Sequence, residues 1–304
     1  MLYVLSSNDL KRWEYEAEFN LGSDLREPRF MVFKGKLFLY FFQGGANPLS
    51  FAPDHIYATE RVGKAVWKKP KAIYEKGYVV WRAKERDGTA YMSVYYGAGL
   101  YSNETEPGHL RLLESHDGYK YELVNGREVS TETSAEEGEF EFDVEGNLYA
   151  TIRLEMKGGK VCRAPKEDIT EWTCKFTPHK YDSALMFRHG KDFYVVARRN
   201  VDGPFNKKAG WLPVSLRSKY YLARYSFTRK RTTLYKFNRK NLELEPLFDF
   251  SSTGDTAYAG ITKLDKNRYL LLNYSSPVDG FDWNWIGGQL VGSNIYSTVL
   301  EFKD

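Results

Sequence analysis

Side chains that can do chemistry recur at one position of a repeated pattern in this chain of 304 residues. The positions nine residues before five turn residues hold Arg26, Val79, Glu137, Tyr181 and Tyr258. The matching positions on the strands that follow hold Phe42, Tyr95, Arg153, Arg198 and Tyr274. Because a hairpin brings its two ends together, we expect each pair of positions to meet. Around a common centre, these pairs would gather three arginines, one glutamate and several tyrosines at one rim.

This mixture of side chains is suited to anion binding and to proton transfer. Three arginines outnumber the single Glu137, and unpaired guanidinium groups hold carboxylates in a bidentate manner. A carboxylate beside a tyrosine hydroxyl can act as its base. The alternative is structural, because charges near a channel axis can neutralise one another or bind water.

The elements that must position these residues are five hairpins. Each reads as a strand, a tight turn and a returning strand, with little helical periodicity. The hairpins span Arg26–Phe42, Val79–Tyr96, Glu137–Arg153, Tyr181–Arg198 and Tyr258–Tyr274, with turns at Gly35, Gly88, Gly146, Gly190 and Asn267. An aspartate followed four residues later by an aromatic residue recurs as Asp9 and Trp13, Asp117 and Tyr121, and Asp168 and Trp172. The aspartate is expected to cap a turn, and the ring to anchor the outer strands.

The spacing of the aromatic residues predicts the fold class. Trp13, Trp67, Tyr121 and Trp172 are 54, 54 and 51 residues apart, and four strands in that length form a propeller blade. A β-sandwich also has many short strands, but it gives no reason for one register to recur five times. We therefore predict an all-β, single-domain propeller over residues 1–304. Five four-stranded antiparallel blades are expected, with six as the alternative.

Closure of the ring is expected from the two ends of the chain. The stretch Tyr3–Phe19 carries outer-strand signals without an inner hairpin, and Ile295–Phe302 stands alone as a final strand. We predict that the first stretch completes the fifth blade beside the last strand.

Composition excludes several classes of protein and partner. The chain is 16% aromatic and 42% hydrophobic, which excludes a disordered chain. No apolar run is long enough to span a membrane, and no signal peptide is evident, so a cytoplasmic location is expected. The net charge of +4 is scattered, which gives no nucleic-acid footprint. No cofactor or metal motif is present. Cys162 and Cys174 are expected to be reduced, with a disulfide as the alternative.

Several short motifs resemble the sialidase superfamily of propeller glycosidases. Leu-Arg26-Glu-Pro28 resembles the arginine motif of the first sialidase blade, whose arginine binds the sugar carboxylate. Glu137 and Arg153, 16 residues apart, resemble the central glutamate and second arginine of that family. Arg198 would be the third arginine. Thr-Ala-Tyr258-Ala-Gly looks like the segment that carries the tyrosine nucleophile. The Asp–aromatic turns resemble Asp boxes, one residue short.

The resemblance implies cleavage of a terminal, acidic sugar. A neutral Tyr258 hydroxyl can attack a sugar that already carries a carboxylate, with Glu137 accepting its proton. Sialidases place an acid/base aspartate after the first hairpin, and residues 43–53 contain none. Asp54 is the nearest candidate. Trp81 and Arg82 add an aromatic ring and a fourth cation to the substrate-binding set.

A five-bladed ring indicates a second family, the furanosidase and xylosidase propellers. Those enzymes use three carboxylates near the starts of inner strands. Glu27, Glu137 and Asp182 fit that pattern, with Asp255 beside them, although Glu27 and Asp182 are one residue out of register. The opening Ser-Asn-Asp-Leu-Lys-Arg-Trp resembles an outer strand common in that clan, whose substrates would be neutral sugars.

The sequence thus predicts a glycoside hydrolase with a carbohydrate substrate and no cofactor. The sialidase-type mechanism is the first hypothesis and the carboxylate mechanism the second. A non-catalytic glycan-binding propeller is the third. Phe281-Asp-Trp283-Asn-Trp285 could offer rings to a sugar or could fold onto a blade, and the insertion Asp202–Ser218 could cover a pocket.

Overall fold

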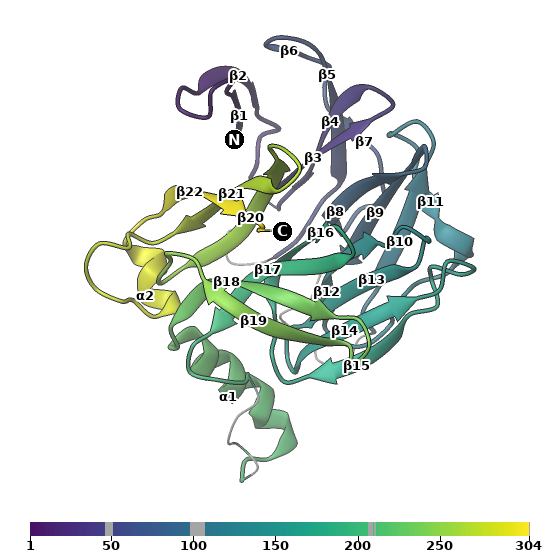
Figure 1. Ribbon diagram of the computed structural model, residues 1–304. Helices are drawn as coiled ribbons and strands as arrows, with labels where there is room; N and C mark the ends of the chain where they lie inside the picture. Colours follow the sequence, from purple (N-terminus) through teal and green to yellow (C-terminus); the bar gives the residue numbers. More distant parts are fainter. Residues whose placement is uncertain (46–50, 98–106, 206–208, 210, 304) are drawn as a thin grey trace. The chain divides into compact units, whose positions relative to one another are not determined.

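The computed structural model describes residues 1–45, 51–97, 107–205, 209 and 211–303 (Figure 1). The chain divides into two compact units, Met1–Gly138 and Glu139–Asp304. Both are built almost entirely of antiparallel strands. In the described part of the chain, no helix is both long and apolar enough to cross a bilayer.

The first unit holds a small N-terminal sheet and two larger sheets. The N-terminal sheet pairs β1 (Leu2–Ser6) with β2 (Glu14–Phe19). The next sheet contains β3 (Leu25–Phe33), β4 (Lys36–Gln43), β5 (Ile56–Gly63), β6 (Val66–Trp67) and β7 (Lys71–Ala72). The third contains β8 (Tyr78–Arg86), β9 (Thr89–Tyr96), β10 (Leu110–Ser115) and β11 (Glu122–Leu123), followed by a 3-10 turn, Val124–Gly126.

Three further sheets follow along the chain. One contains β12 (Ala135–Phe142), which begins in the first unit, β13 (Leu148–Leu154), β14 (Gly158–Ala164) and β15 (Thr173–Thr177). The next contains β16 (Asp182–His189), β17 (Asp192–Asn200), β18 (Lys230–Asn238) and β19 (Glu243–Asp249). The last contains β20 (Thr256–Lys263), β21 (Arg268–Ser275) and β22 (Asn294–Glu301). Helix α1 (Val214–Ser226) lies in the β17–β18 connection and α2 (Trp285–Leu290) in the β21–β22 connection.

The five larger sheets are the blades of a five-bladed β-propeller, which confirms the predicted fold class. All five predicted inner hairpins are present, as β3–β4, β8–β9, β12–β13, β16–β17 and β20–β21. Two of their turns show why glycine is needed. Lys34–Gly35 and Asp87–Gly88 each have positive φ at both residues, which is the geometry of the tight hairpin turn that matches strand twist. The predicted completion of the fifth blade by Tyr3–Phe19 and the single domain stay predictions.

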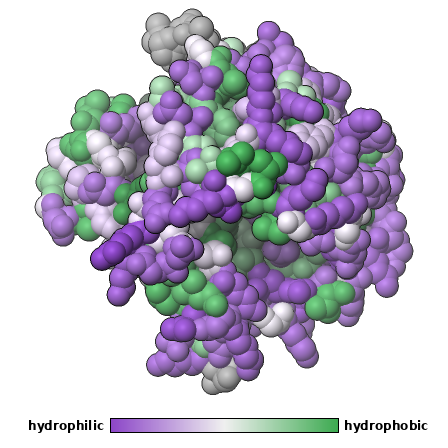
Figure 2. All heavy atoms as spheres, turned by 90° about the horizontal axis from the view of Figure 1, so that it is seen from above, coloured by the Kyte–Doolittle hydropathy of each residue, from purple (hydrophilic) through white to green (hydrophobic). Residues whose placement is uncertain are grey.

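Packing explains why the inner strands read as continuous apolar runs. In β4, Phe38–Phe42 are buried without alternation, because both faces of the strand are covered. In the second unit, Phe193, Val195 and Ala197 of β17 pack into one cluster, while Tyr194 and Val196 pack into another. The face drawn in Figure 2 is mostly hydrophilic, with small separate hydrophobic patches.

A one-residue bulge interrupts four of the inner hairpins near their open ends. In β3, Arg26 faces Phe42 and Arg29 faces Tyr40, so Glu27 and Pro28 share one partner position. The β16–β17 and β20–β21 pairs shift in the same way after Asp182 and after Ala257, and β8 shifts at Trp81. An extra residue of this kind bends a strand and redirects its side chains.

The strand pairing corrects the predicted register at two blades. Arg26 does face Phe42, and Val79 does face Tyr95. Arg198, however, faces Asp182 and not Tyr181, and Tyr274 faces Ala257 and not Tyr258. Asp182 is therefore in register, contrary to the expectation from residue counting. Counting assumed equal turns, but Gly190 is the first residue of its turn, whereas Gly35 and Gly88 are the second, and the turn that holds Asn267 is longer.

The aspartate turns form as predicted, but the Trp13 ring is not buried against the outer strands as expected. Asp9 Oδ1 accepts hydrogen bonds from the backbone N–H groups of Lys11 and Arg12 at 2.9 and 2.8 Å. Asp117 makes the equivalent contacts. Tyr121 is buried, whereas Trp13 is 46% exposed. The turn forms locally, while burial of the ring requires a neighbouring strand.

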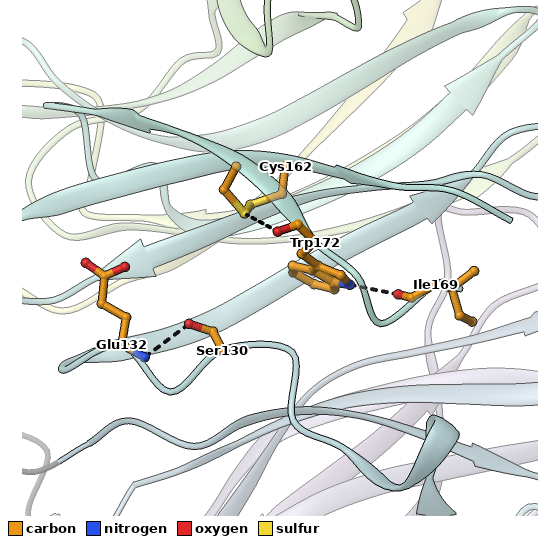
Figure 3. The surroundings of a disulfide bond; sticks show 6 residues. Ser130, Glu132, Cys162, Ile169 and Trp172 are labelled. Atoms are coloured by element: carbon orange, nitrogen blue, oxygen red, sulfur yellow. Dashed lines mark hydrogen bonds between the residues drawn. A yellow bond between two sulfur atoms is a disulfide. The ribbon is translucent and has the colours of Figure 1, made fainter. Parts of the chain in front are cut away.

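The two cysteines are joined by a disulfide, which corrects the expectation of a reduced pair. Cys162 of β14 faces Cys174 of β15 directly in the ladder, so register alone brings the sulfur atoms together. Figure 3 shows the bond beside the Trp172 indole, whose Nε1–H donates to the Ile169 carbonyl at 2.9 Å. The bond ties an edge strand to its blade.

We predict that replacing Cys162 and Cys174 together with alanine lowers the free energy of unfolding by about 2–3 kcal/mol, because the open chain regains loop entropy. Urea unfolding monitored by tryptophan fluorescence measures this. Reductant should destabilise the native chain and leave the double variant unchanged. If reductant does not change the stability of the native chain, the two cysteines are reduced, as the sequence predicted.

Candidate functional site

Four chemically distinct side chains near the starts of inner strands lie on left-handed backbone. Glu27, Glu137, Ser183 and Tyr258 have φ of 54°, 47°, 55° and 49°. For a residue other than glycine this conformation costs about 1 kcal/mol, and such strain concentrates at functional sites. The residue after each is Pro28, Gly138, Ala184 or Ala259, so a small or cyclic residue follows the strained one. The start of the inner strands is therefore the candidate site.

The space beside Glu137 is narrow. A Cβ atom at Gly138 would lie 2.8 Å from Leu110 Cδ1. A larger residue at position 138 would therefore have to displace the end of the Leu110 side chain.

In the first unit, the structure brings Glu27 and Trp81 together through Arg29. Arg29 Nη2 lies 2.6 Å from Glu27 Oε2, and its Nε donates to the Trp81 carbonyl. The guanidinium also lies over the Trp81 ring, 5.0 Å from its centroid. Sequence reasoning missed Arg29 because it is three residues beyond the register position. Its role is to fix a carboxylate and a ring from two different blades.

Three other predicted residues of this unit lie apart from that group or at its edge. Arg26 is exposed and pairs with Asp24. Asp54 pairs with His55 and Lys76, both at 3.1 Å. The hydrogen bond from His55 is the main cause of a lowered pKa at Asp54, which disfavours the acid role. Arg82 is half-buried and faces Ser93 in the ladder.

Glu137 is one of three buried glutamates in β12. It is 3% exposed, and Glu136 and Glu139 are fully buried. Buried carboxyl groups are rare unless a fold or a reaction needs them. The glutamate that both predicted mechanisms share is thus a buried side chain on strained backbone.

In the second unit, Asp182 lies at the centre of a buried ionic network. Its carboxylate is 2.9 Å from Arg153 Nε and 3.9 Å from Lys180 Nζ, and it accepts a hydrogen bond from the Tyr225 hydroxyl. Burial by itself would raise its pKa, but the charges of Arg153 and Lys180 outweigh burial and lower it. Asp182 is therefore ionised, and it holds the Arg153, Lys180 and Tyr225 side chains in position.

The same network continues through Glu155. Its carboxylate accepts from Arg153 and lies 2.6 Å from Lys180 Nζ. Neither Lys180 nor Tyr225 carries a sequence motif. The spacing of two residues between Arg153, in β13, and Glu155, in the turn that follows, is the one signal that could have found part of this network.

Asp255 organises a second group that reaches the surface. Its Oδ1 accepts from the Tyr274 hydroxyl at 3.0 Å and from Trp285 Nε1 at 2.9 Å, and lies 3.2 Å from Arg198 Nη2. The ring of Tyr258 stacks on Tyr274 with centroids 5.9 Å apart. Tyr258 is 38% exposed, so part of this group reaches the surface.

The arginines do not carry the surplus charge that the sequence implied. Each has its own carboxylate within its own unit. Arg26 pairs with Asp24, Arg153 with Glu155 and Asp182, and Arg198 with Asp255. The reasoning from unneutralised charge therefore fails, because the partners lie at positions outside the repeated register. The pairing of Tyr258 with Glu137 stays a prediction.

A small cavity in the second unit is lined by cationic and aromatic side chains. Its volume is about 10 Å³, close to what one water molecule requires. Its walls include Lys180, Arg198, Tyr225 and Phe205. Among the described residues, no group of three or more histidine, cysteine, aspartate or glutamate side chains is arranged to hold a metal ion.

Comparison with known proteins supports the fold class. No family model matches the chain, and no curated protein matches its sequence. Among solved structures, a Dyadobacter fermentans protein of unknown function matches 99% of this chain and 84% of its own, with a TM-score of 0.68 and 15% identity.

Two enzymes share the fold at lower similarity. A GH32 β-fructofuranosidase from Bombyx mori has a TM-score of 0.52 and 12% identity over 86% of this chain, which spans 58% of that enzyme. An endo-arabinase from Bacteroides thetaiotaomicron has a TM-score of 0.51 and 13% identity, covering 93% and 95% of the two chains. The neighbours are five-bladed propellers of the second predicted clan, and a sialidase resemblance is not among these findings.

Lys230 provides a test of the buried network. It is fully buried, and its Nζ donates to the Tyr225 and Thr228 carbonyls at 2.6 and 3.2 Å. Burial, helped by the charge of Arg198, lowers its pKa from 10.5 to about 6. Between these values the unfolded chain carries a proton that the folded chain lacks, so stability rises with pH.

We predict that Lys230→Met removes up to about 1.4 kcal/mol per pH unit from the slope of unfolding free energy between pH 6.5 and 9. Urea titrations at several pH values give the slope. Exposed Lys240→Met is the matched control and should keep it. An unchanged slope in Lys230→Met would mean that this lysine is charged in the folded protein.

Proposed function

We propose that this chain is a glycoside hydrolase that works with carboxylates at the starts of its inner strands. The observation that carries the proposal is the backbone conformation that Glu27 and Glu137 share: each is the third residue of its inner strand, β3 or β12, and each has a left-handed φ. Both residues belong to the first unit. The fold shared with a β-fructofuranosidase and an endo-arabinase supports the same class.

The surroundings of the two glutamates suggest different roles. The ion pair with Arg29 favours the carboxylate form of Glu27, which suits a base or nucleophile. Glu137 is buried, and burial in general favours a protonated carboxyl group, which suits a general acid. Two carboxyl groups held in different environments are the usual requirement for glycoside hydrolysis. Asp182 and Asp255 position their neighbours through ion pairs and hydrogen bonds.

A neutral sugar is the proposed substrate. Arg153 and Arg198 are each paired in the interior, so a substrate carboxylate bound to either would have to displace an existing partner. Breaking a buried ion pair typically costs several kcal/mol. The furanosidase and xylosidase reading is therefore favoured over the sialidase-type reading.

We expect Glu27→Gln and Glu137→Gln each to lower kcat by at least about 100-fold, because general acid–base groups contribute that much or more. Aryl arabinofuranosides, fructofuranosides, xylosides and sialosides serve as the substrate panel. The exposed Glu122→Gln is the control and should keep the native rate.

Three results would contradict the carboxylate mechanism. Full activity in both variants would exclude the carboxylate pair. Hydrolysis confined to the sialoside and abolished by Tyr258→Phe would support the sialidase-type mechanism instead. Binding of a glycan without turnover of any substrate would favour a carbohydrate-binding propeller.

A further inference from the structure

The loop between β21 and α2 presents aromatic rings to solvent. Phe281 is 69% exposed, and its ring meets that of Trp283 at 4.8 Å with an interplanar angle of 64°. Isolated exposed rings are ordinary on protein surfaces, but adjacent rings on one loop form a surface that favours a ligand with apolar faces.

This loop is held rigidly by the residue between the rings. Asp282 accepts from Arg231 Nη1 and Nη2 at 2.9 and 2.7 Å, and from Thr253 Oγ1 at 2.6 Å. Arg229 adds a longer contact of 3.4 Å. A bidentate guanidinium fixes orientation as well as distance. The rings are therefore presented by a pre-ordered loop, which reduces the entropy that ligand binding would cost.

The loop is also tied to the candidate site residues of its unit. Trp285, two residues after Trp283, donates to Asp255, which accepts from Tyr274, on which Tyr258 stacks. The backbone N–H of Trp285 donates to the Thr228 carbonyl at 3.0 Å. Two aromatic pairs, Tyr258 with Tyr274 and Phe281 with Trp283, are thus linked through Asp255 and the segment that carries Trp285. We name this set the aromatic strip. Its members are Tyr258, Tyr274, Trp285, Trp283 and Phe281.

The charges along the aromatic strip are neutralised within the protein. Asp255 pairs with Arg198, and Asp282 pairs with Arg231 and Arg229. A ligand at the aromatic strip would therefore contact aromatic rings and polar groups that already have partners within the protein. Sugar rings have apolar faces formed by C–H groups and polar edges, so uncharged sugar units match such a surface. A charged ligand would find no unpaired partner among these five charged side chains.

We propose that the aromatic strip is a glycan-binding surface that stacks uncharged sugar units of an oligosaccharide. The choice of carbohydrate as the ligand rests on the proposed function. The exposed ring of Phe281 and the half-buried ring of Trp283 contribute the stacking, while Asp282 is a positioning residue that keeps their loop in place.

We expect Phe281→Ala and Trp283→Ala to weaken oligosaccharide binding by about tenfold each, which corresponds to roughly 1.4 kcal/mol for the loss of one stacked ring. Arabinotetraose, xylotetraose and the fructan tetrasaccharide nystose are the probes, and isothermal titration calorimetry measures the affinity. Phe248→Ala is the matched control, because Phe248 is 45% exposed on β19 outside the strip and should leave affinity unchanged. Thermal unfolding confirms that each variant is folded.

Asp282→Asn tests positioning separately from contact. It should weaken binding of the same tetrasaccharide by loosening the loop, and Phe281→Ala should add little further loss in that background. Independent, additive losses would mean that Asp282 does not act through the rings.

Binding and turnover distinguish this proposal from the proposed function. If no glycoside is hydrolysed but the two ring variants lose affinity, the aromatic strip stands and the catalytic proposal falls. If aryl monoglycosides are hydrolysed while the ring variants bind tetrasaccharides like the native chain, the strip is overturned. Failure of the native chain to bind any of the three tetrasaccharides would overturn it as well.

Discussion

One backbone irregularity governs the candidate chemistry of this protein. A regular ladder would alternate side chains between the two buried faces of each inner strand, and none would be redirected at its start. The extra residue in the bulge breaks the alternation and places Glu27, Ser183 and Tyr258 on left-handed backbone. The small strain at each is offset by the sheet on either side. The recurrence of the bulge makes the strand starts into a set of equivalent sites that differ only in side chain.

The buried charges follow from the same arrangement. Once Asp182 is placed in the interior, it requires cations and donors, and Arg153, Lys180 and Tyr225 supply them. Those cations require further carboxylates, of which Glu155 is one. Arg153 thus lies between two carboxylates of the protein itself, so its charge is already balanced by Asp182 and Glu155. This is the physical reason for preferring a neutral sugar over an acidic one.

Local patterns predicted the repeated parts of the fold well. Turn residues, strand composition and the spacing of about 54 residues follow from short-range preferences, and all five hairpins formed where expected. The partners of each functional residue were not predictable in that way. Arg29, Tyr225 and Trp285 meet Trp81, Asp182 and Asp255 across long stretches of sequence. The disulfide was mispredicted for a similar reason, because cysteine counting says nothing of which residues face each other in a ladder.

The sequence by itself determined the propeller class, the hairpins and the short set of charged and hydroxyl residues at their ends. These depend on periodicity and turn chemistry, which act within a few residues. Tertiary structure alone decided which carboxylate faces which cation, that Asp182 is in register, and that Trp13 is exposed. These pairings, registers and exposures depend on one-residue differences in turns and bulges and on packing between strands that are distant in the chain. A one-residue shift exchanges the faces of a strand, and composition cannot record it.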